Sequence, residues 1–393
     1  MSADVVSIEP RDDAADSEAF FGALAQPGVR GLRAYDPGHD LVALRRRAAM
    51  HALVELGSNE NPYGPSPRAM EAAHASLDDA HRYPDPLGGD LSRALAAQHG
   101  VAPAQILLGN GSHELLMQFA QVFAGPGVDV VASRYGFAVY ALAAQAAGAT
   151  LVLADAYPHD HHRQPRGHDL DAIAASISGA TRLVYLANPN NPTGTWFACD
   201  AFAQFMQRVP QEVFVVVDEA YAEFAIDDAE GYRSAFALLP HHRNLVVART
   251  FSKAYALAGL RVGYAVGDAG LIAVMQRVRE SFNVNMPALA AALAALDDPT
   301  HLAAGIAANR AQREALIAAL RESGWNVTPS ATNFVLVEFG ERTPAIEAGL
   351  LARSVVLRPM GGYGLPECLR ITVGTAAENA RLLAALDDVG AAA

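Results

Sequence analysis

The chain has 393 residues, 51% of them hydrophobic and 18% charged, which indicates a folded protein rather than a disordered one. Its formal net charge of −13 argues against nucleic acid or an anionic membrane surface as the main partner, because both are negatively charged. The length is sufficient for one large domain and a smaller one, and no uncharged apolar run approaches the roughly 20 residues of a membrane span.

The first three quarters of the chain predict an α/β fold. A polar, acidic stretch up to about Gln26 is expected to be a mobile arm. Apolar runs that read as strands then alternate with stretches of helical spacing, of which 112–123 and 136–147 are the clearest. The expected strands are 105–108, 129–132, 151–153, 182–186, 212–217 and 244–248. Because strands that are apolar on both sides favour a parallel sheet covered on both faces, we expect a mostly parallel central sheet with helices on each side.

The last quarter of the chain follows another pattern. A helix near 303–323 precedes apolar stretches at 332–337, 355–358 and 368–373. Helices and strands segregated in this way are typical of an α+β unit with antiparallel strands. The sequence therefore predicts a second, smaller domain.

Side chains suited to chemistry follow the predicted strands. They are Ser112, Tyr135, Asn191, Asp218 and Lys253. Ligands of open α/β sheets bind just outside the carboxyl ends of the strands. Any one of these residues could be an ordinary turn or cap residue, but five at strand ends predict one common site.

Lys253 lies in the most informative motif, TFSKAYALAGLR at 250–261. A lysine amine at the end of a strand can form a Schiff base with an aldehyde. Ser252 and Arg261 can hold a phosphate beside it. These are the requirements of pyridoxal phosphate chemistry.

Two further motifs accompany it, NPNNPTG at 188–194 and DEAY at 218–221. In this order and at these intervals, the three motifs resemble the fold-type I aminotransferases, and most closely the histidinol-phosphate aminotransferase branch, from about residue 53 to about residue 373. The resemblance implies three parts. Residues 1–75 would form an N-terminal arm and part of the small domain, 76–298 the large cofactor-binding domain, and 299–393 the C-terminal small domain.

The resemblance also implies a role for each strand-end residue toward the cofactor, pyridoxal 5'-phosphate. Lys253 would hold the cofactor covalently and transfer protons. Asp218 would pair with the pyridine nitrogen, while Asn191 and Tyr221 would bond to the 3-oxygen. Tyr135 would stack on the ring.

The phosphate of the cofactor would be bound by a cup of residues from two loops. By resemblance these residues are Gly111, Ser112, His113, Ser252 and Arg261. Relatives often carry Asn or Asp at the position of His113, so the sequence leaves the role of that side chain open. A helix that begins at Ser112 would add its N-terminal dipole to the cup.

Other positions resemble residues that bind substrate or join two subunits. Arg370 would bind the anionic end of the substrate, with Arg358 and Tyr35 as auxiliary phosphate contacts. Tyr83 would reach the cofactor phosphate of a neighbouring subunit, which implies a homodimer. Phe282 stands where many relatives have tyrosine, and it leaves room for an aromatic amino donor.

The expected reaction is transfer of an amino group between histidinol phosphate (with imidazole acetol phosphate as its keto partner) and glutamate or 2-oxoglutarate. An aromatic amino-acid aminotransferase is the alternative, and a non-catalytic binding or regulatory protein of the same fold is a remote one. No metal is expected, because the histidines of the 159–168 segment lack a regular ligand spacing. Cys199 and Cys368 are far apart, and the start lacks a signal-peptide pattern, so we expect reduced thiols in a cytoplasmic protein.

Overall fold

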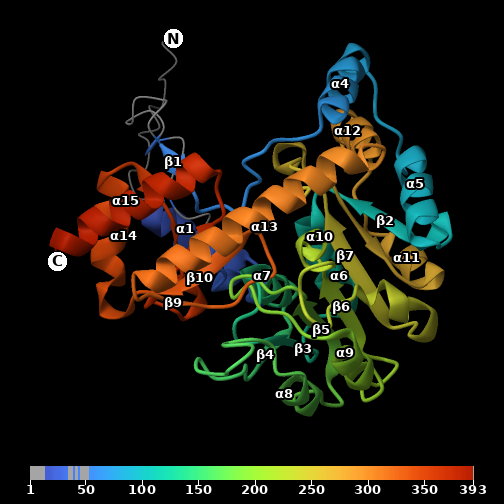
Figure 1. Ribbon diagram of the computed structural model, residues 1–393. Coiled ribbons are helices and arrows are strands. Elements are labelled where there is room, and N and C mark those ends of the chain that lie inside the picture. The colour runs from blue at the N-terminus through green and yellow to red at the C-terminus, as the bar shows by residue number, and fades with distance from the viewer. Residues whose placement is uncertain (1–13, 34–38, 40–42, 45–52, 393) are drawn as a thin grey trace, which may run out of the picture.

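A seven-stranded sheet forms the centre of the larger part of the molecule (Figure 1). The computed structural model describes residues 14–33, 39, 43–44 and 53–392. The strand order is β2-β8-β7-β6-β5-β3-β4, and β8 runs antiparallel to both of its neighbours while the other pairs are parallel. The strands are β2 (Ile106–Gly109), β3 (Asp129–Ser133), β4 (Thr150–Ala154), β5 (Thr181–Ala187), β6 (Phe214–Asp218), β7 (Leu245–Thr250) and β8 (Gly263–Val266).

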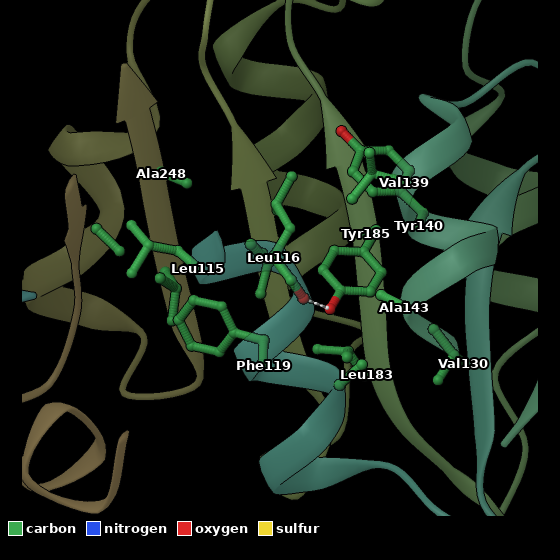
Figure 2. Close-up of a cluster of buried hydrophobic side chains, with 14 of the residues drawn as sticks. Leu115, Leu116, Phe119, Val130, Val139, Tyr140, Ala143, Leu183, Tyr185 and Ala248 are labelled. Carbon is green, nitrogen blue, oxygen red and sulfur yellow. Dashed lines mark hydrogen bonds between the residues drawn. The ribbon is translucent and has the colours of Figure 1, made fainter. Parts of the chain in front are cut away.

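Helices cover this sheet on both faces, because its central strands are apolar on both sides. Val216 of β6 packs into one cluster with α6 (Ser112–Phe123), α7 (Ala138–Ala146) and α11 (Ala269–Met275). Its neighbours Val215 and Val217 pack on the opposite face with α8 (Leu170–Ala175) and α9 (Cys199–Met206). Figure 2 shows the first cluster, where Leu115, Leu116 and Phe119 of α6 lie against the strands. The predicted α/β fold with a mostly parallel sheet is confirmed.

The smaller part is built on an antiparallel sheet of order β12-β13-β10-β9. Its strands are β9 (Asn326–Val327), β10 (Phe334–Glu338), β12 (Arg358–Pro359) and β13 (Cys368–Thr372), and its core includes residues of α13 (Pro299–Glu322), α14 (Thr343–Ala352) and α15 (Ala376–Ala392). The prediction of a single strand at 355–358 is wrong. β11 (Val355–Val356) pairs parallel with β1 (Val54–Glu55), and the chain passes to the other sheet at Leu357.

The remaining elements are short or peripheral. The helices are α1 (Ala14–Leu24), α2 (Pro27–Arg30), α4 (Pro67–Ser76), α5 (Gly89–His99), α10 (Ala222–Ala225) and α12 (Met286–Leu296). The described residues also form the 3-10 turns η1 (Leu77–Asp79), η2 (Pro103–Gln105), η3 (Ala235–His241), η4 (Ala258–Leu260), η5 (Gly340–Arg342) and η6 (Gly361–Tyr363). The sequence pattern did not predict α1 within the expected arm. No helix among the described residues has the length and apolarity needed to cross a bilayer.

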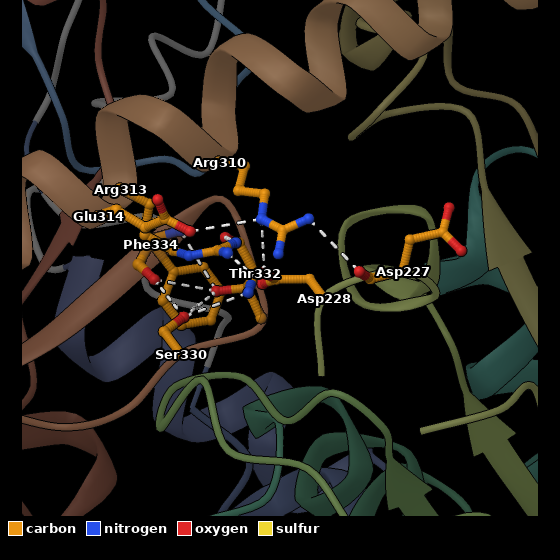
Figure 3. A network of polar contacts seen from close by, with 8 residues as sticks. All are labelled: Asp227, Asp228, Arg310, Arg313, Glu314, Ser330, Thr332 and Phe334. Carbon is orange, nitrogen blue, oxygen red and sulfur yellow. Dashed lines mark hydrogen bonds and ion pairs between the residues drawn. The ribbon is translucent and has the colours of Figure 1, made fainter. Parts of the chain in front are cut away.

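The long helix α13 runs between the two parts and ties them together (Figure 1). Its Arg310 and Arg313 both pair with Asp228, which lies in the loop after α10 on the large-sheet side (Figure 3). Arg313 also donates a hydrogen bond of 2.9 Å to the carbonyl of Thr332, in the turn before β10. This network fixes that turn, and therefore the start of β10, relative to the large sheet.

Candidate active site

One cavity of about 160 Å³ lies at the carboxyl ends of β5, β6 and β7. Its walls come from segments that are far apart in the sequence, near residues 58, 112, 190, 220, 253 and 370. The predicted residues that line it are Ser112, His113, Asn191, Asp218, Tyr221, Ser252, Lys253, Arg261 and Arg370. Most of the expected residues therefore meet in one place, at the carboxyl ends of the parallel strands.

Asp218 is the last residue of β6, and its side chain forms part of the cavity floor. One carboxylate oxygen accepts from the Ala220 N–H at 3.2 Å, and the other accepts from the Tyr140 hydroxyl at 3.3 Å. Burial raises the pKa of Asp218 to about 6, whereas these hydrogen bonds and the nearby Lys253 charge oppose the rise. At neutral pH the buried carboxylate is therefore mostly ionised.

Lys253 follows β7 by three residues and projects into the cavity from the neighbouring strand. Its Nζ donates to the Asn59 carbonyl at 3.2 Å and lies 5.8 Å from the centre of the Tyr221 ring. Burial, assisted by the nearby charge of Arg370, lowers the pKa of Lys253 to about 8. A lysine of this kind is neutral in about a tenth of the molecules at pH 7, far more often than a lysine with the ordinary pKa, and the neutral amine is the nucleophile.

An anion cradle lies at the N-terminus of α6. Gly111 precedes the helix at φ +81°, and a Cβ at this position would lie 2.5 Å from Nη2 of Arg261. Arg261 also donates to the Ser252 hydroxyl at 3.3 Å, so the two loops meet around one point. The first N–H groups of a helix lack intrahelical partners, and together with a guanidinium and a hydroxyl they suit a phosphate. The residues present therefore fit the phosphate of the expected cofactor.

His113 stands next to this cradle and lines the cavity. Burial lowers its pKa from the ordinary value, and the adjacent Arg261 charge acts in the same direction. Both effects favour the neutral imidazole. Arg261 is therefore the main cation of the cradle.

Arg370 of β13 enters the cavity from the small sheet. Its Nη1 donates to the Asn191 side-chain oxygen at 2.6 Å, and its Nη2 donates to the Gly57 carbonyl at 2.8 Å. The guanidinium also lies 5.3 Å from the ring centre of Phe334. These contacts hold a buried cation in the wall of the cavity, where it can receive the anionic end of a substrate.

Asn59 is a central residue that the sequence reasoning missed. Its side chain donates to the Tyr221 hydroxyl at 2.9 Å, and its N–H donates to the Thr372 hydroxyl at 2.9 Å. It adopts a left-handed φ of +55°, which asparagine tolerates better than most residues. It lies in the segment SNENP at 58–62, where no local pattern marks a residue of the site.

Tyr135 is not among the residues that line this cavity, and its stacking on the cofactor ring stays a prediction. The Gly136 N–H bonds to the Ser133 carbonyl at 2.8 Å, which closes a turn at the end of β3. After this turn Phe137 lines the cavity, while the Tyr135 ring packs on a separate cluster that contains Leu336.

Three further expected residues lie elsewhere or outside the described residues. Tyr83 is 80% exposed and stacks on Phe282 with ring centres 4.6 Å apart. Arg358 lines a neighbouring groove of about 600 Å³, which shares Phe137 with the cavity, and it is the register partner of Arg370 across β12 and β13. Tyr35 lies outside the described residues.

The histidines of the 159–168 segment form no metal centre. His161 stacks on Tyr157 with ring centres 4.3 Å apart, and buried His168 accepts a hydrogen bond from the Ala187 N–H at 3.3 Å. Burial lowers the pKa of His168 to about 4, so its ring is neutral. Within the described ranges, no three His, Cys, Asp or Glu side chains gather as metal ligands would.

Comparisons with known proteins identify the family of the chain. The family model "Aminotransferase class I and II" matches residues 51–386. Histidinol-phosphate aminotransferase 2 of Methylococcus capsulatus is 47% identical over 367 residues, which cover 93% of this chain and 98% of that protein. Its namesake from Pseudomonas aeruginosa is 45% identical, over 94% of this chain and 98% of that protein. The crystal structure of histidinol-phosphate aminotransferase from Sinorhizobium meliloti in complex with pyridoxal-5'-phosphate aligns with a TM-score of 0.84 at 32% identity, covering 94% of this chain and 98% of that one. The chain therefore belongs to the class I and II aminotransferase family, in its histidinol-phosphate aminotransferase branch.

Proposed function

We propose that this protein is a pyridoxal 5'-phosphate-dependent histidinol-phosphate aminotransferase, which moves an amino group between histidinol phosphate and 2-oxoglutarate. The observation that carries the proposal is one cavity that combines Lys253, the buried carboxylate of Asp218 and a phosphate cradle. The names of the relatives, at 45–47% identity over nearly the whole chain, support the substrate. When bound, the cofactor supplies an electron-accepting ring for the bond changes at the substrate's α-carbon.

Lys253 would act twice in this reaction. Its neutral Nζ would bind the aldehyde carbon of the cofactor, and after release the same atom would move a proton at the substrate's α-carbon. The support is its lowered pKa and its place between the Asn59 carbonyl and the Tyr221 ring. A lysine with an ordinary pKa would be almost wholly protonated at neutral pH and unsuited to either task.

The other polar groups of the cavity would bind and orient. Asp218 would hold a proton on the ring nitrogen, and Tyr221 with Asn191 would bond to the ring's 3-oxygen. Arg261 with Ser252 and the N-terminus of α6 would hold the phosphate. In support of the first role, the Asp218 carboxylate is 5% exposed and receives two hydrogen bonds, which is the arrangement of an ionised partner for a buried cation.

Arg370 would bind the anionic end of either substrate, a carboxylate in one case and a phosphate in the other. Arg358 would contribute mainly to the phosphate, because a phosphate carries more charge and more acceptor oxygens than a carboxylate. The groove beyond Phe137 supports this division, since Arg33 and Arg134 line it together with Arg358. This groove would admit the distal part of a phosphorylated substrate.

We further propose a homodimer in which Tyr83 reaches the cofactor phosphate of the partner. The support is the exposed Tyr83 ring, stacked on Phe282 and outside the cavity of its own chain. The division of the chain at residues 75 and 298 also stays a proposal. It is supported by the pairing of β1 with β11 on the small-sheet side. A cytoplasmic location stays a prediction from the sequence.

A comparison of amino donors tests the function. Histidinol phosphate should be turned over with a far higher kcat/KM than phenylalanine, tyrosine or histidine. Arg358→Ala should slow single turnover of histidinol phosphate by roughly 10- to 100-fold, as expected for a lost charge-assisted contact of about 1.5–3 kcal/mol. The phenylalanine half-reaction should be nearly unaffected. If the unmodified enzyme ignores histidinol phosphate and uses phenylalanine, it is an aromatic amino-acid aminotransferase instead.

The remaining alternative, a binding protein without activity, has a separate test. A preparation loaded with the cofactor should lose the visible absorbance of its linkage to Lys253 on addition of glutamate, and Lys253→Ala should lack both this absorbance and this response. If the absorbance of the unmodified protein does not change with any amino donor, the protein is a non-catalytic binding protein.

A further inference from the structure

Two fully buried tyrosines stack on each other in the core of the large sheet, and one of them contacts Asp218. Tyr140 comes from α7 and Tyr185 from β5, and their ring centres lie 4.9 Å apart with an interplanar angle of 5° (Figure 2). Both side chains belong to the core cluster between the sheet and α6. Both rings are therefore buried in the same cluster, and their hydroxyl groups bond to different acceptors.

The two hydroxyls have different acceptors. The Tyr185 hydroxyl donates to the backbone carbonyl of Leu116 at 2.5 Å, away from the cavity. The Tyr140 hydroxyl donates to the carboxylate of Asp218 at 3.3 Å. A donor held against an ionised acceptor in a dry environment interacts more strongly than it would in water. Only one of the two rings therefore acts on the site.

We propose that Tyr140 is a positioning residue that keeps the Asp218 carboxylate ionised and oriented toward the ring nitrogen of the cofactor. The inference rests on the proposed role of Asp218 and extends it to a residue that does not itself contact the cofactor. Burial raises the pKa of Tyr140 well above its ordinary range, so the hydroxyl keeps its proton and remains a donor at every pH of interest.

The surroundings of Asp218 show why a donor is needed there. Lys253, after β7, favours the ionised carboxylate, whereas Glu219, its neighbour in the chain, disfavours it. Tyr221 faces the same carboxylate from the adjoining turn. Burial is the largest influence and favours the protonated acid, with the pKa raised to about 6. Because the Tyr140 hydrogen bond opposes that rise, its removal should raise the pKa further.

The test compares Tyr140→Phe with the matched variant Tyr185→Phe, each of which loses one buried hydroxyl. The dissociation constant of pyridoxal 5'-phosphate from the full-length, cofactor-free chain is measured by equilibrium dialysis across pH 5 to 8.5. Affinity should fall at low pH, where Asp218 is protonated and no longer pairs with the ring nitrogen. In Tyr140→Phe the pH at which affinity falls should be higher by about one unit, so the dissociation constant on the acid side should be about tenfold larger than that of the unmodified protein. In Tyr185→Phe this pH should stay in place.

A cofactor analogue with carbon in place of the ring nitrogen separates this role from a packing role. Unmodified protein and Tyr140→Phe should bind the analogue equally, because Asp218 then has no nitrogen to pair with. If Tyr140→Phe does not fold by circular dichroism, Tyr140→Met removes the same donor. The inference is overturned if affinity falls at the same pH in Tyr140→Phe as in the unmodified protein, or if Tyr140→Phe loses as much affinity for the analogue as for the cofactor. Either result leaves the proposed function intact. Failure of the unmodified protein to bind the cofactor overturns both.

Discussion

We expect Arg249→Met to lower the melting temperature by several degrees, because Arg249 neutralises two buried carboxylates behind the active site. Its Nε and Nη2 donate to Glu219 at 3.1 and 2.7 Å, and its Nη1 donates to Glu223 at 3.1 Å. The Arg249 side chain is 7% exposed and that of Glu219 is not exposed at all. Glu219 also accepts from the Ser234 hydroxyl and the Ala235 N–H, at 2.7 and 2.6 Å.

The expected magnitude follows from burial. Removing one member of a buried ion pair costs about 3–5 kcal/mol, because the other member is left uncompensated. With an unfolding entropy of about 2.1 cal/mol/K per residue, a chain of 393 residues that unfolds as one unit has about 0.8 kcal/mol/K. The melting temperature should therefore fall by about 4–6 °C.

Scanning calorimetry of Arg249→Met and Arg243→Met gives the comparison. Arg243 is 90% exposed and pairs with Asp268 at 3.3 Å, so its loss should cost about 0–1 kcal/mol and at most about 1 °C. Adding Glu219→Gln to Arg249→Met should restore part of the loss, since it removes one of the stranded charges. Equal falls in melting temperature for the two single variants would refute the argument that Arg249 compensates buried carboxylates.

Three further predictions concern the site itself. Because the pKa of Lys253 is about 8, the rate at which cofactor-free protein captures pyridoxal 5'-phosphate should rise about tenfold per pH unit and level off above pH 8; stopped-flow absorbance that shows no pH dependence would contradict this. Asp218→Asn should lower kcat far more than it changes the KM of the amino donor, and an unchanged kcat would make Asp218 a mere strand-end cap. Mixed subunits of Lys253→Ala and Tyr83→Ala should regain some activity through hybrid dimers, which a monomer in sedimentation would exclude.

The central sheet and the residues at its strand ends were predictable from the sequence, because both depend on local patterns. Continuous apolar runs marked β5, β6 and β7, and the residue types after them marked Asp218 and Lys253. Parallel strands place their carboxyl ends at one edge of the sheet, so no long-range information was needed to bring these side chains together.

The missed features depend on contacts between distant segments. Strand β8 is four residues long and begins with a glycine, so it carries too weak a pattern to be recognised. The functional contacts of Asn59 reach Tyr221 and Thr372, and no local pattern records them. Tyr140 reads as an apolar-face residue of α7, and its bond to Asp218 exists only once α7 has packed on the sheet.

Hydrogen bonds join the segment near Asn59 to residues 370 and 372, and they set when the site can form during synthesis. The Asn59 N–H bonds to Thr372 and the neighbouring Gly57 carbonyl bonds to Arg370, both across 313 positions. At about 5–20 residues per second, a ribosome needs roughly 15–60 s to span that distance. The strands from β2 to β8 can meet long before then. The constellation around Lys253 is completed only once Arg370 and Thr372 have been synthesised, so a chain that stops short of Arg370 lacks a finished site.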